Sequence, residues 1–116
     1  MKANEMRIGN YVKSNDVNMA SYFTVTASFL KQNENEMSWF IDPIPLNTNW
    51  LLKLGFKYNN YEELYQKDIF DIDIIDDVYC HFYMNEYGDW YKNIEYVHEL
   101  QNLYFALTGN ELIIEL

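Results

Sequence analysis

The stretch Phe70-Asp71-Ile72-Asp73-Ile74 alternates apolar and acidic residues without interruption. A period of two is typical of a β-strand that has one face in the core and the other in solvent. We therefore expect the apolar residues to face inward and the carboxylates of Asp71 and Asp73 to be displayed together, outward. This strand predicts a sheet with an acidic outer face.

The alternation continues in the next segment, where Val78, Cys80, Phe82 and Met84 form one predicted face and Tyr79, His81 and Tyr83 the other. The whole stretch from Tyr61 to Met84 is interpreted as consecutive strands, because it is bounded by polar turn residues. Further strands are predicted over residues 7–12, 21–30, 37–41, 94–96 and 112–116, with 21–41 as a hairpin. Gly9 is expected to supply a bulge or a positive φ angle in the first of these.

Two helices are predicted between and after the strands. Asn47 or Thr48 is a plausible N-cap for a short helix anchored by Trp50 and ended by Gly55. A longer helix is expected over residues 97–107, followed by Gly109, because its apolar residues recur at helical spacing: Val97, Leu100, Leu103, Tyr104 and Leu107. The predicted fold class is α+β, a small antiparallel sheet packed with one short helix and one longer C-terminal helix, in a single compact domain over residues 1–116.

Composition favours a folded cytoplasmic protein. The chain has 116 residues, 49% of them hydrophobic and 18% aromatic, which is too many aromatic residues for a disordered acidic tail. The single cysteine, Cys80, excludes an internal disulfide and a multi-cysteine zinc site. No apolar run approaches the roughly 18 residues that span a bilayer, and the first residues lack a secretory signal.

The charge balance indicates what kind of partner to expect. Eight basic residues face eighteen acidic ones, for a net charge of −10. Such a chain is repelled by phosphate backbones and by anionic membranes, which argues against direct nucleic-acid or membrane binding and favours a basic protein partner. The alternative interpretation is that acidity only keeps a tyrosine-rich protein soluble.

The acidic residues concentrate between Glu62 and Asp89, where nine acids accompany one base, Lys67. Carboxylates beside aromatic rings suit a protein interface, in which rings anchor and charges select lysine and arginine. The predicted partner-binding residues are Asp71, Asp73, Asp76, Asp77, Tyr79, Tyr83, Tyr87 and Trp90. The competing interpretation is a solvated outer face with several of these rings closing the core.

No pattern in the chain predicts catalysis, a metal or a cofactor. Two carboxylates on an extended strand do not converge on a calcium ion, which needs six or more oxygens. Cys80 and His81 are adjacent, so on a strand they point to opposite faces and cannot form a nucleophile–base pair. A nucleophile elbow, a phosphate-binding glycine loop and a zinc-protease helix motif are all missing from the sequence. We expect a protein that is not an enzyme.

Four segments resemble a family of small proteins encoded by phages and mobile elements of Bacteroidetes: Met1–Val12, Pro43–Leu46, Trp50–Phe56 and Tyr96–Leu112. The family has no known catalytic residue to carry over. The resemblance implies an inhibitor of host defence of the anti-CRISPR kind, acting in the cytoplasm of a host bacterium. Its expected target is a CRISPR effector, the RNA-guided RNA nuclease of type VI systems, or its guide-bound complex. The alternative is an accessory or structural module that self-associates through residues 112–116.

Overall fold

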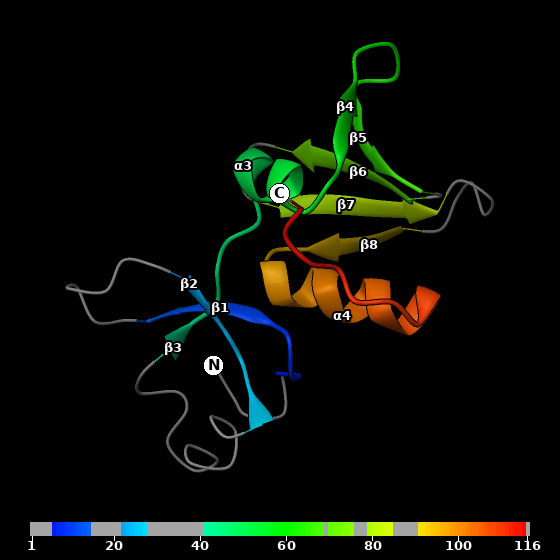
Figure 1. The fold of residues 1–116 in the computed structure, drawn as a ribbon. Coiled ribbons are helices and arrows are strands. Elements are labelled where there is room, and N and C mark those ends of the chain that lie inside the picture. Colours follow the sequence, from blue (N-terminus) through cyan, green and yellow to red (C-terminus); the bar gives the residue numbers. More distant parts are fainter. Residues whose placement is uncertain are drawn as a thin grey trace. The chain divides into compact units, whose positions relative to one another are not determined.

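The computed structural model describes residues 6–14, 22–27, 41–68, 70–75, 79–84 and 91–115 (Figure 1). The chain divides into two compact units. The first unit is Met1–Pro45 with Tyr96–Leu112, and the second is Leu46–Glu95 with Ile113–Leu116. Each unit therefore combines segments that are far apart in the sequence, and the larger segment of the second, residues 46–95, lies between the two segments of the first.

The first unit contains a three-stranded antiparallel sheet in the order β2-β1-β3. The strands are β1 (Tyr11–Ser14), β2 (Tyr22–Thr24) and β3 (Ile41–Asp42). The central strand is β1, in which Val12 and Tyr11 are buried. Before it, Gly9 has the predicted positive φ, at 97°, and donates its N–H to the carbonyl of Val25 over 2.9 Å.

The predicted hairpin over residues 21–41 is wrong in the described part of the chain. Both β2 and β3 pair with β1 instead, through Tyr11↔Thr24 and Lys13↔Asp42. The physical reason is that β1 pairs along both of its edges, and this order depends on pairing between distant segments, which a local pattern does not specify. Residues 28–40, which hold the rest of the predicted hairpin, lie outside the described residues.

The longer helix, α4 (Val97–Thr108), confirms the predicted helix to within one residue at its end. Val97, Leu100 and Tyr104 are buried, whereas Leu107 is 40% exposed, so the apolar face is narrower than predicted. Gly109 follows with φ 76° and donates its N–H to the carbonyl of Phe105 over 2.8 Å, as expected of a left-handed cap.

A fully buried glutamine, Gln101, fastens α4 to the rest of the first unit. Its Oε1 accepts from the backbone N–H of Tyr11 over 2.7 Å. Its Nε2 donates to the carbonyls of Gly9 and Leu112, over 2.9 and 3.1 Å. All three partners are backbone groups, so one side chain joins β1, the helix and the segment after it.

Arginine and asparagine side chains extend this arrangement. Arg7 donates to Glu111, to the Asn102 side chain over 3.1 Å and to the Gln101 carbonyl over 3.2 Å. Asn10 donates to the same Asn102 oxygen over 2.9 Å. These five residues (Arg7, Asn10, Gln101, Asn102 and Glu111) are called the closing network below. Their hydrogen bonds join residues 7–10, near the start of the chain, to residues 101–111, near its end.

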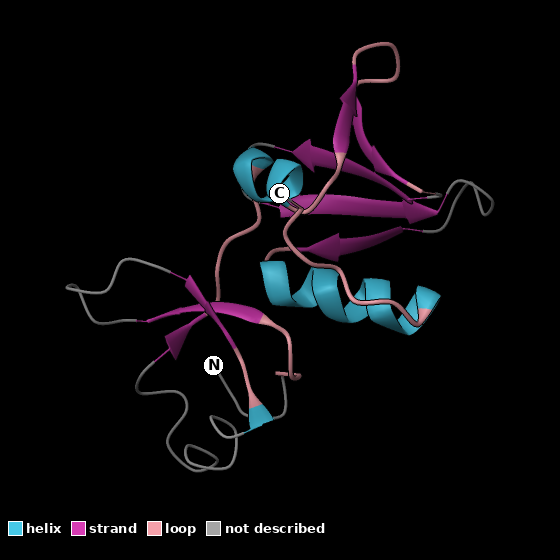
Figure 2. Cartoon of the chain, viewed as in Figure 1, coloured by secondary structure: helices cyan, strands magenta, loops and turns pink. Residues whose placement is uncertain are grey.

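The second unit contains a five-stranded antiparallel sheet whose spatial order follows the sequence, β4-β5-β6-β7-β8 (Figure 2). The strands are β4 (Lys57–Asn59), β5 (Leu64–Lys67), β6 (Phe70–Ile75), β7 (Tyr79–Met84) and β8 (Tyr91–Ile94). Each strand pairs with the next one along the chain, so the sheet is a simple meander. The sequence did not predict β4, and it placed β8 three residues too late.

The two central strands confirm the predicted alternation on the core side. They pair from Phe70↔Met84 to Ile75↔Tyr79. Phe70, Ile72 and Phe82 are fully buried, and the two phenylalanine rings lie 5.0 Å apart between centroids. Burying such side chains contributes roughly 1.5–3 kcal/mol each, so this pair of strands forms the centre of the second unit.

The short helix is α3 (Thr48–Lys53), and of its two predicted N-caps, Asn47 and Thr48, the cap is Asn47, whose Oδ1 accepts the N–H of Trp50 over 3.0 Å. Trp50 is buried, as expected of its anchor. Gly55 follows with φ 91°, and a Cβ at this position would lie 1.5 Å from an oxygen of Glu115. The positive φ favours glycine here, and a larger residue would also have to displace the Glu115 side chain.

The predicted strand over residues 112–116 is wrong for its described residues, 112–115, which form neither strand nor helix. The N–H of Glu115 instead donates to the carbonyl of Lys53 over 2.8 Å, and its carboxylate lies 3.4 Å from the Lys67 ammonium. Hydrogen bonding to the end of α3 replaces the ladder that a strand would need.

The architecture is nevertheless the predicted α+β class, an antiparallel sheet with one short helix and one longer C-terminal helix. Over the described residues, no helix has both the length and the apolar character needed to cross a bilayer.

Candidate protein-binding surface

The strand register brings the predicted acidic and aromatic residues opposite one another. Asp71 pairs with Tyr83, and Asp73 pairs with His81, across β6 and β7. Tyr79 lies on the same strand, opposite Ile75. Residues that are paired across an antiparallel ladder share a face of the sheet, so this part of the prediction agrees with the backbone. Asp76, Asp77, Tyr87 and Trp90 lie outside the described residues.

Outward display of both strand carboxylates is wrong at Asp71. Asp71 is only 7% exposed, and Asp73 is half-buried. Gln66, directly opposite on β5, donates its Nε2 to Asp71 Oδ1 over 3.0 Å. The alternation of residues within one strand predicts which face of the sheet a side chain is on. Whether a residue of the neighbouring strand buries that side chain depends on how the two strands pair.

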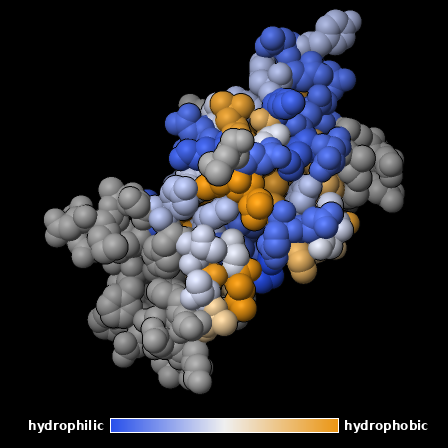
Figure 3. Space-filling model, viewed as in Figure 1, coloured by the Kyte–Doolittle hydropathy of each residue, from blue (hydrophilic) through white to orange (hydrophobic). Residues whose placement is uncertain are grey.

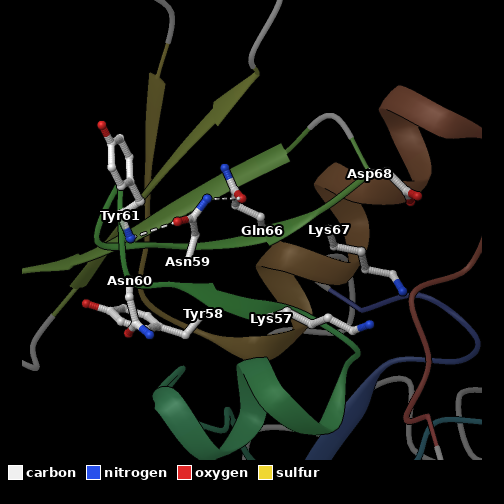
Figure 4. Close-up of a pocket in the computed structure, with 8 residues that line it drawn as sticks. All are labelled: Lys57, Tyr58, Asn59, Asn60, Tyr61, Gln66, Lys67 and Asp68. Carbon is white, nitrogen blue, oxygen red and sulfur yellow. Dashed lines mark hydrogen bonds between the residues drawn. The ribbon is translucent and has the colours of Figure 1, made fainter.

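Gln66 is the centre of a second polar arrangement, at the β4–β5–β6 end of the sheet. Its Nε2 also donates to Glu62 Oε2 over 3.0 Å, and its Oε1 accepts from Asn59 Nδ2 over 3.0 Å. Asn59, Glu62, Gln66 and Asp71 are called the hairpin network below. The Asn59–Gln66 hydrogen bond crosses between the two hairpin strands (Figure 4).

The hairpin network fixes the loop between β4 and β5. The Asn59 side-chain oxygen accepts the N–H groups of Tyr61 and Glu62, over 2.9 and 3.2 Å. The Asn59 carbonyl accepts the N–H of Glu63 over 2.7 Å. Glu63 itself has φ 57°, a left-handed conformation that non-glycine residues adopt at some cost. The loop is thus held in one conformation by its own side chains.

Tyr61 is presented at this tip. It is 96% exposed, and its side chain points away from the hairpin ribbon (Figure 4). Glu62 and Glu63 beside it are exposed, and the β4–β5 hairpin is dominated by hydrophilic residues (Figure 3). The sequence analysis missed Tyr61. The signal that could have identified it is a single aromatic residue between a pair of asparagines and a pair of glutamates.

A hollow of about 600 Å³ lies beside the hairpin. Its lining combines two tyrosines, three amide side chains, two lysines and one aspartate (Figure 4): Lys57, Tyr58, Asn59, Asn60, Tyr61, Gln66, Lys67 and Asp68. Tyr58 rests against Tyr65, with 5.0 Å between the ring centroids, and Lys67 pairs with Glu115. Among the residues that the structure describes, no group of three or more His, Cys, Asp or Glu could hold a metal ion. The hollow offers amide groups, tyrosine rings and one more lysine than aspartate.

Comparisons of the chain with protein-family models, with curated proteins and with solved structures gave no match. The resemblance to phage and mobile-element proteins therefore stays a prediction.

Proposed function

We propose that this protein acts by binding a basic partner protein, without catalysing a reaction of its own. The observation that carries the proposal is the tip of the β4–β5 hairpin, where Tyr61 is almost fully exposed beside the exposed acids Glu62 and Glu63. A net charge of −10 surrounds this tip with a long-range negative potential.

Aromatic and charged groups contribute differently to such a surface. Rings that become buried supply much of the affinity, whereas charges at the rim raise the association rate and reject partners of the same sign. Phosphate backbones and anionic membranes are partners of the same sign. A protein with exposed lysines and arginines is the class of partner that satisfies both requirements.

The resemblance to phage and mobile-element proteins suggests which basic protein this is. We propose an anti-CRISPR inhibitor that docks on a type VI RNA-guided RNA nuclease, or on its guide-bound complex, where grooves for RNA are basic. The proposed interface keeps Asp73, Asp76, Asp77, Tyr79, Tyr83, Tyr87 and Trp90 from the sequence prediction and adds Tyr61, Glu62 and Glu63. Asp71 is given a supporting role, because it is buried and hydrogen-bonded to Gln66.

Cleavage of a labelled RNA by a purified, guide-bound type VI nuclease tests this proposal. Wild-type protein is expected to inhibit cleavage, and the double variant Glu62→Gln/Glu63→Gln to inhibit about tenfold less well at physiological salt. A matched control, Glu95→Gln/Glu99→Gln, removes the same charge elsewhere and keeps the acceptor that Glu99 offers to the Tyr96 N–H over 3.0 Å.

Two results would contradict the proposal in different ways. Equal losses in the two double variants would show that only total charge matters, so the hairpin tip is not the site. Undiminished cleavage with saturating wild-type protein would exclude this nuclease as the target.

A further inference from the structure

We infer that the β4–β5 hairpin tip recognises an arginine side chain of the partner protein. In this arrangement the Tyr61 ring is the platform on which the guanidinium stacks, and Glu62 and Glu63 supply flanking carboxylates. The inference rests on the proposed function, because it names the chemistry that the binding surface selects.

The exposure of Tyr61 sets it apart from the other large apolar or aromatic residues that the structure describes. At 96% exposed it contributes almost nothing to the core, whereas Tyr22 and Tyr58 are 42% and 47% exposed and each contacts another ring. A ring that does not pack in the core has its whole surface available to contact a ligand. Stacking uses a ring face, and this ring has its faces in solvent.

The loop is built to hold the ring in place before a partner arrives. Asn59 binds the N–H groups of Tyr61 and Glu62, and Gln66 in turn binds Asn59 and Glu62. Rigid presentation reduces the conformational entropy lost on binding. Tyrosine adds little to that loss, because only two side-chain torsions must be ordered.

The carboxylates retain capacity for a cation. Glu62 Oε2 accepts one hydrogen bond, from Gln66, and an ionised carboxylate has about four acceptor positions. Glu63 is exposed next to it. A guanidinium has five N–H donors in a plane, so it can stack on a ring and bind a carboxylate at the same time. A lysine ammonium has no such plane.

The first unit contains the same combination of groups within this chain. The guanidinium carbon of Arg7 lies 4.3 Å from the centroid of the Phe105 ring, and the same side chain pairs with Glu111. An aromatic ring with a neighbouring glutamate therefore already holds one arginine in this protein. Tyr61 with Glu62 and Glu63 presents those two components to solvent.

Charge excludes the other candidate occupants. A second copy of the chain brings another −10 and is repelled at an acidic tip, and so is an anionic membrane surface. A basic protein segment is attracted, and the ring selects arginine over lysine within it.

Titration with two peptides of equal charge, hexa-arginine and hexa-lysine, tests the inference on the full chain. Total electrostatic attraction is nearly the same for both, so the ratio of their dissociation constants reports on the planar guanidinium, and the change of that ratio on replacing Tyr61 isolates the contribution of the ring. We expect wild-type protein to bind hexa-arginine about two- to fivefold more tightly, the factor that an exposed cation–π contact provides. The largest amide chemical-shift changes on adding hexa-arginine are expected at residues 60–63.

The variants make the readout specific to the ring. Tyr61→Ala should bring the ratio close to one, and Tyr61→Phe should keep it. Tyr22→Ala, which removes a partly exposed tyrosine from β2, should also keep it. An unchanged arginine preference in Tyr61→Ala, or equal binding of the two peptides by wild-type protein, would overturn the inference.

This experiment separates the inference from the proposed function. If the nuclease is inhibited equally well by wild-type protein and Tyr61→Ala, the surface binds a basic partner by other residues and only the inference is lost. If the peptides show the expected ratio but the nuclease is unaffected, arginine recognition stands and the proposed target is wrong.

Discussion

Two glutamines, Gln101 in the first unit and Gln66 in the second, use the same side-chain amide for different purposes. Gln101 is fully buried, and its three partners are backbone groups of residues at least 11 positions away in sequence. Gln66 is half-buried, and its partners are the side chains of Asn59, Glu62 and Asp71, all within seven positions.

The two glutamines differ in how buried the groups are to which they are hydrogen-bonded. Gln101 satisfies backbone groups of Tyr11 and Leu112 in buried hydrogen bonds and the carbonyl of Gly9 in a part-buried one, so the first unit depends on it. Of the three side chains that Gln66 orders, Asn59 and Glu62 are accessible to water and only Asp71 is buried, so the sheet depends less on Gln66. The closing network therefore stabilises the fold, whereas the hairpin network prepares a surface. Four substitutions test this contrast, in decreasing order of their expected effect on stability.

Replacing Gln101 by leucine should have the largest effect. The change leaves the buried Tyr11 N–H and Leu112 carbonyl, and the part-buried Gly9 carbonyl, without this partner, at a cost of about 1–3 kcal/mol for each buried group. We expect a loss of about 4 kcal/mol or more in the free energy of unfolding, measured by urea denaturation. Gln66→Leu is the matched control, and an equal loss there would remove the contrast.

Replacing Gly55 by alanine comes next, with an expected loss of about 2 kcal/mol. The new Cβ must tolerate φ 91° and displace the Glu115 side chain, which also disturbs the Glu115–Lys67 pair. Gly109→Ala is the control, because its φ of 76° is similar but nothing lies within 4 Å of the added Cβ. Thermal melts of both variants separate backbone strain from the clash, and an equal shift would show that the clash is unimportant.

Replacing Asn59 by alanine should cost about 1 kcal/mol, since its hydrogen bonds are at the surface. The local effect should be clearer than the global one. Without the side-chain acceptor, the N–H groups of Tyr61 and Glu62 are expected to exchange with solvent faster, in hydrogen-exchange measurements by NMR. Exchange at Tyr11, bound by Gln101, serves as the internal reference and should not change.

Replacing Tyr61 by alanine should change stability least, by less than about 0.5 kcal/mol, because the ring is almost fully exposed. Its effect is expected in binding alone, as measured by peptide titration. A large drop in melting temperature would show that the ring packs on the protein and is not presented to a partner.

Sequence reasoning succeeded where a period alone determines the structure. The alternation at Phe70–Ile74 and the helical spacing at Val97–Leu107 located the central strands and α4, and Asn47 located the start of α3. These features depend on residues within a few positions of one another, so local patterns contain the information.

Long-range pairing explains most of what was missed. The insertion of β1 between β2 and β3 and the burial of Gln101 depend on contacts between distant segments. Asp71 was placed on the correct side of its strand, but its covering by Gln66 follows from the register of β5 with β6. Tyr61 was missed for a different reason: its position depends on the loop conformation set by Asn59.

The interleaving of the two units along the chain has a consequence for synthesis on the ribosome. The strands of the first unit leave the exit tunnel early, but α4 and Gln101 follow only after the whole meander of residues 46–95 has been made. The meander pairs neighbours only, so it can fold as it emerges, whereas the Tyr11 N–H of β1 gains its Gln101 partner only after about 90 more residues have been made. Nascent chains stalled before α4 are therefore expected to protect the meander from protease while β1 is still cut.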